Sequence, residues 1–113
     1  MEHYHPEVCK ALSYIEQHYT DPLTLDEVCR YSRLSKSYFC CFFKEQTSQT
    51  FVEYLNKRRI DHARLLLEDT DLPVTEICYD TGFNDLTHFS RTFKKITGIS
   101  ARAYRSQKRE NQN

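Results

Sequence analysis

The chain contains one pattern of residues twice, about fifty positions apart. The first copy is Asp26-Glu27-Val28-Cys29, Leu34, Phe39, Phe43-Lys44 and Thr47, and the second is Thr75-Glu76-Ile77-Cys78, Phe83, Phe89, Phe93-Lys94 and Thr97. The offset is 49 residues up to the Leu34/Phe83 pair and 50 residues from the Phe39/Phe89 pair onward. This change indicates a difference in length in the turn between two helical segments. Each copy therefore predicts a helix, a short turn and a second helix, the geometry of a helix-turn-helix motif.

Length and composition favour an all-α fold. The 113 residues suffice for one compact domain or two very small ones. Seven Phe and eight Tyr can form a core, whereas two Gly and three Pro are too few for a turn-rich all-β protein. The sequence has no long apolar run, and residues 1–6 lack the apolar core of a signal peptide. We expect no membrane span and a cytoplasmic location.

Helix signals divide the chain into about seven helices. Apolar spacing and capping residues place them at about 6–19, 24–31, 35–46, 50–68, 74–81, 85–97 and from 100 onward. Thr24 with Glu27, and Thr50 with Glu53, are capping boxes. The expected organisation is a first helix-turn-helix subdomain over 1–49, a linker helix over 50–68, and a second helix-turn-helix subdomain over 69–113.

The charges balance overall but not locally. Sixteen Lys and Arg offset sixteen Asp and Glu, which counts against a nucleic-acid binder, because such domains are often basic. The stretch from residue 91 to 109, however, holds seven cations and no acid, which predicts a positive C-terminal surface. These cations are Arg91, Lys94, Lys95, Arg102, Arg105, Lys108 and Arg109. Lys57, Arg58 and Arg59 form a separate cluster upstream.

The five cysteines indicate reduced thiols. Their number is odd, and we expect Cys29 and Cys78, at equivalent repeat positions, to be small core residues. No Cys-x-x-Cys or His-x-x-x-His spacing supports a zinc site, and no base and oriented partner supports a cysteine hydrolase. We therefore predict no metal, no cofactor and no enzyme. A thiol redox switch at Cys40 or Cys41 remains chemically possible.

The second copy holds the residue types that read DNA. In a helix-turn-helix, the second helix enters the major groove. Phe89 and Phe93 are four residues apart and should face the core. The expected outward residues are Leu86, Thr87, His88, Arg91, Lys94 and Lys95. Arg91 can donate two hydrogen bonds to a guanine, and Leu86 can contact a thymine methyl group.

The corresponding helix of the first copy is chemically different. Phe39 and Phe43 take the core positions, and the expected outward residues are Ser37, Tyr38, Cys40, Cys41 and Lys44. Neither cysteine offers a strong hydrogen bond. This helix should therefore provide phosphate, stacking and apolar contacts rather than base discrimination.

From about Val8 to Arg105 the chain resembles the DNA-binding domain of the AraC/XylS family. The residues that carry the resemblance are GFNDLTHFSRTFKKITG at 82–98, Tyr104-Arg105, Leu23-Thr24-Leu25, Ser35, Phe39 and Phe43-Lys44. Three positions depart from the family pattern: Cys41 replaces a usual Arg, Ser48 a usual Gly, and Ala101 a common Pro. The first departure weakens the transfer of base readout to the first copy.

The resemblance implies a regulator of transcription that binds double-stranded DNA. It implies two helix-turn-helix subdomains joined by the helix at 50–68, commonly activation through contact with RNA polymerase, and a sensor domain outside this chain. We expect helices 37–46 and 86–96 to lie on one face and enter successive major grooves about 34 Å apart. Candidate phosphate contacts are Lys44, Lys94, Lys95 and the Arg58–Arg59 pair. The alternative is a helix-turn-helix fold used mainly for protein–protein contact, which the zero net charge favours.

Overall fold

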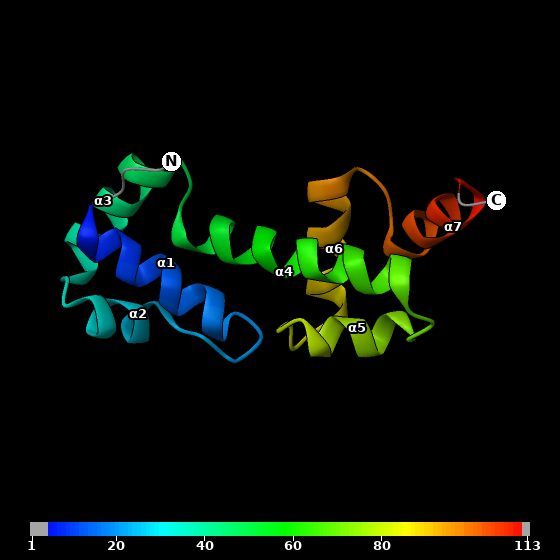
Figure 1. Cartoon of the computed structure of the whole chain (residues 1–113), viewed down its shortest axis with the longest axis horizontal. Coiled ribbons are helices and arrows are strands. Elements are labelled where there is room, and N and C mark those ends of the chain that lie inside the picture. Colours follow the sequence, from blue (N-terminus) through cyan, green and yellow to red (C-terminus); the bar gives the residue numbers. More distant parts are fainter. Residues whose placement is uncertain (1–4, 112–113) are drawn as a thin grey trace. The chain divides into compact units, whose positions relative to one another are not determined.

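The computed structural model describes residues 5–111, and Figure 1 traces their helices. These residues form seven α-helices and no strand, which confirms the predicted all-α fold. The helices are α1 (Pro6–His18), α2 (Leu25–Ser32), α3 (Lys36–Thr47), α4 (Phe51–Asp69), α5 (Val74–Asp80), α6 (Leu86–Thr97) and α7 (Ala101–Asn111).

The chain divides into two compact units, Met1–Leu55 and Asn56–Asn113. The boundary lies inside α4, so this helix contributes its first residues to one unit and the remainder to the other. The separate linker domain over residues 50–68 remains a prediction.

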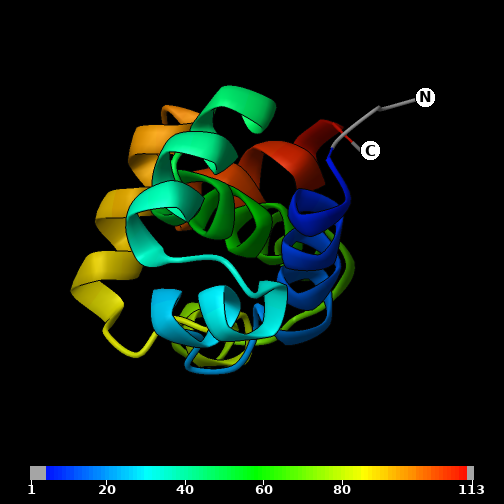
Figure 2. The ribbon, with the colours of Figure 1, turned by 90° about the vertical axis from the view of Figure 1, so that its left-hand side faces the viewer.

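The first unit is closed around the aromatic rings of α3. Helices α1, α2 and α3 contact one another (Figure 2). The rings of Phe39 and Phe43 stack with their centroids 5.1 Å apart, and Phe51 of α4 packs edge-on against Phe39. Val28 and Ile15 are also fully buried in this core. Burying a side chain of this size stabilises the folded state by about 1.5–3 kcal/mol.

The second unit repeats this arrangement with its own residues. Phe89 and Phe93 of α6 are fully buried, and Phe83, in the turn before α6, packs edge-on against Phe89 at 5.3 Å. Residues of α4 and α5 complete the core: Ile60, Ala63, Leu67, Ile77 and Cys78. Both Cys29 and Cys78 are buried, as predicted from their repeat positions.

Capping side chains start the helices where the sequence predicts. The Ser35 hydroxyl accepts a hydrogen bond from the backbone N–H of Tyr38 at 3.3 Å. Thr50 and Glu53 form the full reciprocal capping box, each side chain accepting from the other's backbone N–H. At Thr24 the hydroxyl accepts a hydrogen bond from the backbone N–H of Glu27, as predicted. The same hydroxyl donates to the Glu27 carboxylate, whereas the predicted capping box has this carboxylate accept from the backbone N–H of Thr24.

The difference in length between the copies lies in the turn, as predicted. Helix α3 follows its cap Ser35, and α6 follows its cap Asp85, fifty residues later. The preceding buried hydroxyls, Ser32 and Thr81, are 49 residues apart and both donate to a carbonyl four residues back at 2.8 Å. Asn84, between Phe83 and Asp85, is therefore the additional residue of the second turn.

Each copy has two residues with left-handed backbone conformation, and the copies differ in the residue types found there. The second copy places Gly82 and Gly98 at φ 109° and 89°, whereas the first places Arg33 and Ser48 at φ 63° and 66°. A side chain in this region costs about 1–2 kcal/mol relative to the right-handed region, a cost that glycine avoids. The first copy therefore places non-glycine residues at these two positions, with more backbone strain.

Candidate nucleic-acid interface

Helix α6 separates its core residues from its surface residues cleanly. Phe89 and Phe93 are buried, and all the residues predicted to face outward are exposed. These are Leu86, Thr87, His88, Arg91, Lys94 and Lys95. Their positions on the surface agree with the sequence analysis, and their contact with DNA remains a prediction.

The first turn of α6 is held by Asp85. Its carboxylate accepts hydrogen bonds from the backbone N–H groups of Thr87 at 2.7 Å and His88 at 3.2 Å. The His88 ring packs edge-on against Phe83, with centroids 5.4 Å apart. The end of the helix that would approach base edges is thus fixed by a cap and by the core.

The three cations of α6 are available to an external anion. In the part of the chain that the structure describes, Arg91, Lys94 and Lys95 make no ion pair or side-chain hydrogen bond. They lie within two turns of one helix, where backbone phosphates of a duplex could meet them. Lys44 of α3 is likewise exposed and without a partner among the described residues.

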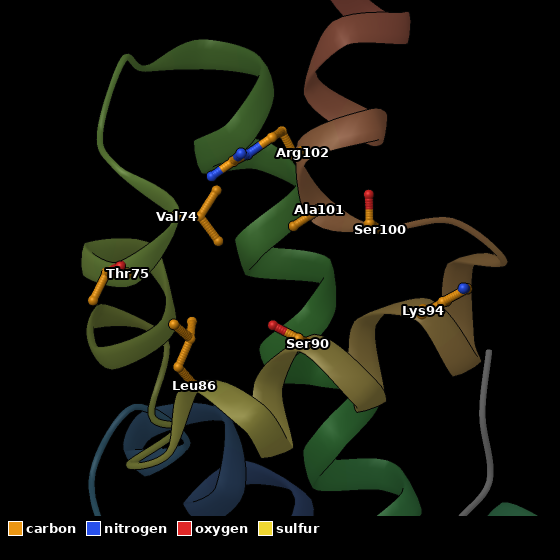
Figure 3. A pocket seen from close by; sticks show the side chains of 8 residues that line it. All are labelled: Val74, Thr75, Leu86, Ser90, Lys94, Ser100, Ala101 and Arg102. Carbon is orange, nitrogen blue, oxygen red and sulfur yellow. The ribbon is translucent and has the colours of Figure 1, made fainter.

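One side of α6 borders a shallow recess of about 310 Å³. Figure 3 shows Leu86 and Ser90 of α6 pointing toward Val74 and Ala101, with Lys94 at the end of the recess away from Val74. Thr75, Ser100 and Arg102 complete the lining. Leu86 therefore belongs to the side of the helix next to α5 and α7, whereas Arg91 does not line the recess.

Helix α3 exposes every residue predicted for it. Ser37, Tyr38, Cys40, Cys41 and Lys44 are all on the surface. Tyr38 is 52% exposed, and its ring stacks on that of Phe42, with centroids 5.2 Å apart. Phe42 in turn packs against His5, whose backbone N–H donates to the Gln46 side chain at 2.8 Å. Tyr38 is thus packed on Phe42 while about half of the residue stays exposed.

The two helices present the same alternation of buried and exposed positions. Residues 39–50 and residues 89–100 agree in burial class at all twelve positions. The same fifty-residue correspondence, extended to the starts of the two helices, identifies two surface residues that the sequence analysis omitted. Ser90 is exposed at the position equivalent to Cys40, and Lys36 is exposed at the position equivalent to Leu86. The fifty-residue offset alone could have located both.

The predicted positive C-terminal surface needs correction. Arg105 donates to the backbone carbonyls of Leu67 and Thr70 at 3.1 Å each, and thereby satisfies the end of α4. Arg109 pairs with Asp71 at 2.6 Å, and the Lys108 ammonium lies 5.4 Å from the centroid of the Tyr104 ring. These three cations therefore have partners within the chain, unlike the three cations of α6.

Arg59 also differs from the prediction. The residue is only 8% exposed, and its guanidinium carbon lies 5.7 Å from the centroid of the Phe83 ring. Burial lowers the pKa of Arg59 below its usual value. The residue packs within the second unit, so it is not placed to neutralise a phosphate.

Two small helical units, each with a capped and exposed second helix, define a tandem helix-turn-helix domain. The sequence matches the helix-turn-helix domain family of AraC type over residues 28–107. The chain belongs to this family, whose members are DNA-binding domains of transcription regulators.

Known proteins of this family resemble the chain in sequence and structure. The melibiose operon regulatory protein of Escherichia coli (strain K12) is 34% identical over 98 residues, covering 87% of this chain and 32% of that protein. The C-terminal domain of AraT, a response regulator from Geobacillus stearothermophilus, has a TM-score of 0.90 and 33% identity, with 94% and 88% coverage. The chain spans about a third or less of the length of the curated relatives it matches.

The fold also matches a domain solved with DNA. The DNA-binding domain of AdpA, described as a global transcriptional factor in complex with a target DNA, has a TM-score of 0.88 and 22% identity. The match covers 93% of this chain and 95% of that domain. Separately, none of the helices in residues 5–111 is both long and apolar enough to cross a membrane.

Proposed function

We propose that this chain binds double-stranded DNA sequence-specifically to regulate transcription, with α6 as the main base-reading helix. The observation that carries the proposal is the group Arg91, Lys94 and Lys95, three cations without partners on one exposed, capped helix. The buried pair Phe89 and Phe93 holds this helix against its own unit, so these side chains are presented from a rigid support.

Each exposed residue of α6 has a role in this proposal. Arg91 donates two parallel hydrogen bonds to O6 and N7 of a guanine, and Leu86 packs on a thymine methyl group. Thr87 and His88 contact a base or a phosphate from the first turn. Lys94 and Lys95 neutralise phosphates, a contact that sets position and affinity rather than sequence.

Helix α3 contributes differently. Lys44 neutralises a phosphate, the accessible face of Tyr38 stacks or packs against the duplex, and Ser37 donates a hydrogen bond from its hydroxyl. Cys40 and Cys41 offer only weak donors, so they supply apolar contact. We propose that α3 and α6 enter successive major grooves, about 34 Å apart.

The wider role follows the family. We propose a cytoplasmic activator that contacts RNA polymerase, with a sensor domain outside this chain. The short span of the chain relative to its curated relatives supports the idea of an output domain joined to further domains.

Selection from a pool of random duplexes, followed by footprinting on the enriched sequence, tests the proposal. Two protected segments one helical turn apart support the use of both helices. No enrichment at low salt would favour the alternative, a domain used mainly for protein–protein contact, which the net charge of zero favours. A single protected segment would restrict the reading role to one helix.

A further inference from the structure

Three side chains of the second unit form a connected row from α4 to the first turn of α6. The guanidinium carbon of Arg59 lies 5.7 Å from the centroid of the Phe83 ring. The His88 ring packs edge-on against the same ring, with centroids 5.4 Å apart and planes at 71°. Phe83 is buried, whereas His88 is exposed on the helix proposed to read DNA. The row therefore connects a buried cation to a candidate reading residue.

Arg59 is a charged residue beside apolar core residues. Its neighbours on α4, Ile60 and Ala63, are fully buried, and Arg59 itself is 8% exposed. Taking a guanidinium out of water costs free energy, and burial lowers the pKa of Arg59 accordingly. A cation is attracted to the face of an aromatic ring, and the attraction is stronger where water is excluded. The contact with Phe83 thus offsets part of the cost, and it restricts the ring as well as the guanidinium.

The first copy holds different residue types at the positions equivalent to Phe83 and His88. Leu34 replaces Phe83, and Tyr38 replaces His88. Leu34 offers no aromatic face to a cation, and the Tyr38 ring stacks on Phe42 of its own helix, with centroids 5.2 Å apart. The surface ring of α3 is therefore packed on its own helix. The surface ring of α6 is packed on a core residue that also contacts α4.

We propose that Arg59 is a positioning residue for DNA readout by α6, acting through Phe83 on the imidazole of His88. This inference rests on the proposed function, in which His88 contacts a base or a phosphate. The His88 backbone is held separately, because its N–H donates to the Asp85 carboxylate at 3.2 Å. The orientation of the imidazole is set by its packing on Phe83. A side chain that is ordered before binding loses less conformational entropy when DNA arrives, so its contact binds more tightly.

Three variants of the full chain test the role of Arg59. Arg59→Met keeps the length of the side chain and removes the charge and the planar guanidinium. Arg59→Lys keeps the positive charge and should preserve part of the attraction to the Phe83 ring. Arg64→Met is the matched control, because Arg64 also lies on α4 and its guanidinium carbon is 6.0 Å from the centroid of another ring, that of Tyr104. Circular dichroism establishes that each variant is folded.

Nuclear magnetic resonance of the histidine rings measures the positioning without DNA. The signals of the His88 ring, which His88→Gln identifies by their loss, are shifted by the neighbouring Phe83 ring. In Arg59→Met they should move toward the values of a solvent-exposed histidine, with a smaller movement in Arg59→Lys and none in Arg64→Met. His18 of the first unit is the internal reference. Should Arg59→Met not fold, Arg59→Lys decides alone, and unchanged His88 signals in the folded variants of Arg59 would overturn the inference.

DNA binding is measured separately, on a duplex enriched by selection. His88→Ala should weaken binding by about threefold or more in the original chain, and much less when Arg59→Met is already present. A purely structural Arg59 would weaken binding equally with and without the His88 ring, so an equal effect of His88→Ala in both backgrounds would overturn the DNA role of Arg59. Failure of the original chain to bind any duplex would instead overturn the proposed function, and the ring signals would still decide whether Arg59 positions His88.

Discussion

Thr47 and Thr97, fifty residues apart, end α3 and α6 with the same set of hydrogen bonds. The Thr47 hydroxyl lies 2.8 Å from the Phe43 carbonyl and 3.0 Å from the Gln49 carbonyl, and it accepts from the Gln49 N–H at 3.2 Å. The Thr97 hydroxyl is 2.8 Å from the Phe93 carbonyl and 2.9 Å from that of Ile99, and accepts from the Ile99 N–H at 3.3 Å. The two copies therefore match down to the hydrogen bonds made by individual backbone N–H and carbonyl groups.

Removing this hydroxyl should destabilise either unit. Thr97→Val keeps the shape but leaves the Ile99 N–H without its acceptor, so we expect a loss of about 1 kcal/mol in the free energy of unfolding. Thr97→Ser, which keeps the hydroxyl, is the matched control and should cost less than the valine. Urea unfolding followed by circular dichroism provides the measurement. A valine variant as stable as the original chain would show that the hydroxyl contributes nothing.

The left-handed residues that end α3 and α6, Ser48 and Gly98, predict opposite effects on stability. Ser48→Gly should stabilise the chain by up to about 1 kcal/mol, because glycine avoids the strain at φ 66°. Gly98→Ala should destabilise it by a similar amount. A Cβ at Gly98 would meet no atom within 4 Å, so the backbone conformation alone causes this cost. Thermal unfolding of both variants tests the pair, and a stabilising alanine at 98 would contradict the explanation.

Base readout should depend on the second copy more than on the first. Arg91→Ala should cost about 1–3 kcal/mol at a preferred site and relax the preference there, since a charged bidentate donor is lost. Cys40→Ser and Cys41→Ser should change selectivity much less, because they keep the size and alter only a weak polar group. Binding-site selection on the three variants compares them directly. Loss of preference in the cysteine variants, with Arg91→Ala unaffected, would reverse the assignment.

Salt dependence should identify the phosphate contacts. The slope of log affinity against log salt is about −0.9 per phosphate neutralised. Replacing both Lys94 and Lys95 by Gln should therefore flatten the slope by about 1.8. Lys57→Gln serves as the control, because Lys57 already pairs with Asp61 at 3.1 Å. An equal change in the control would show that the slope reports overall charge rather than contacts made by α6.

Local signals made the helix boundaries predictable from sequence. The caps Ser35, Thr50 and Asp85 bond to amides two or three residues away, so their effect depends on neighbours in the chain. The phenylalanines were also predictable, because spacing by four residues places Phe89 and Phe93 on one side of a helix. These short-range rules located both candidate reading helices.

Long-range contacts were not predictable in this way. Arginine is a residue type usually found at the surface. Arg59, however, is buried near Phe83, and Arg105 donates hydrogen bonds to carbonyls more than thirty residues away in the chain. No pattern in the sequence separates such structural arginines from those free to meet an anion. Telling these two kinds of arginine apart requires the three-dimensional packing of α4 against the rest of the second unit.

The shared burial of residues 39–50 and 89–100 has a consequence for how such a chain can diversify. The buried positions form the scaffold, while the exposed positions carry no share of the core and can change without altering it. Exchanging only the fully exposed residues of these two segments would transfer surface chemistry, whereas half-buried residues such as Phe42 and Ile96 pack against their own cores. The same backbone scaffold can therefore carry two different surface chemistries through substitutions at exposed positions alone.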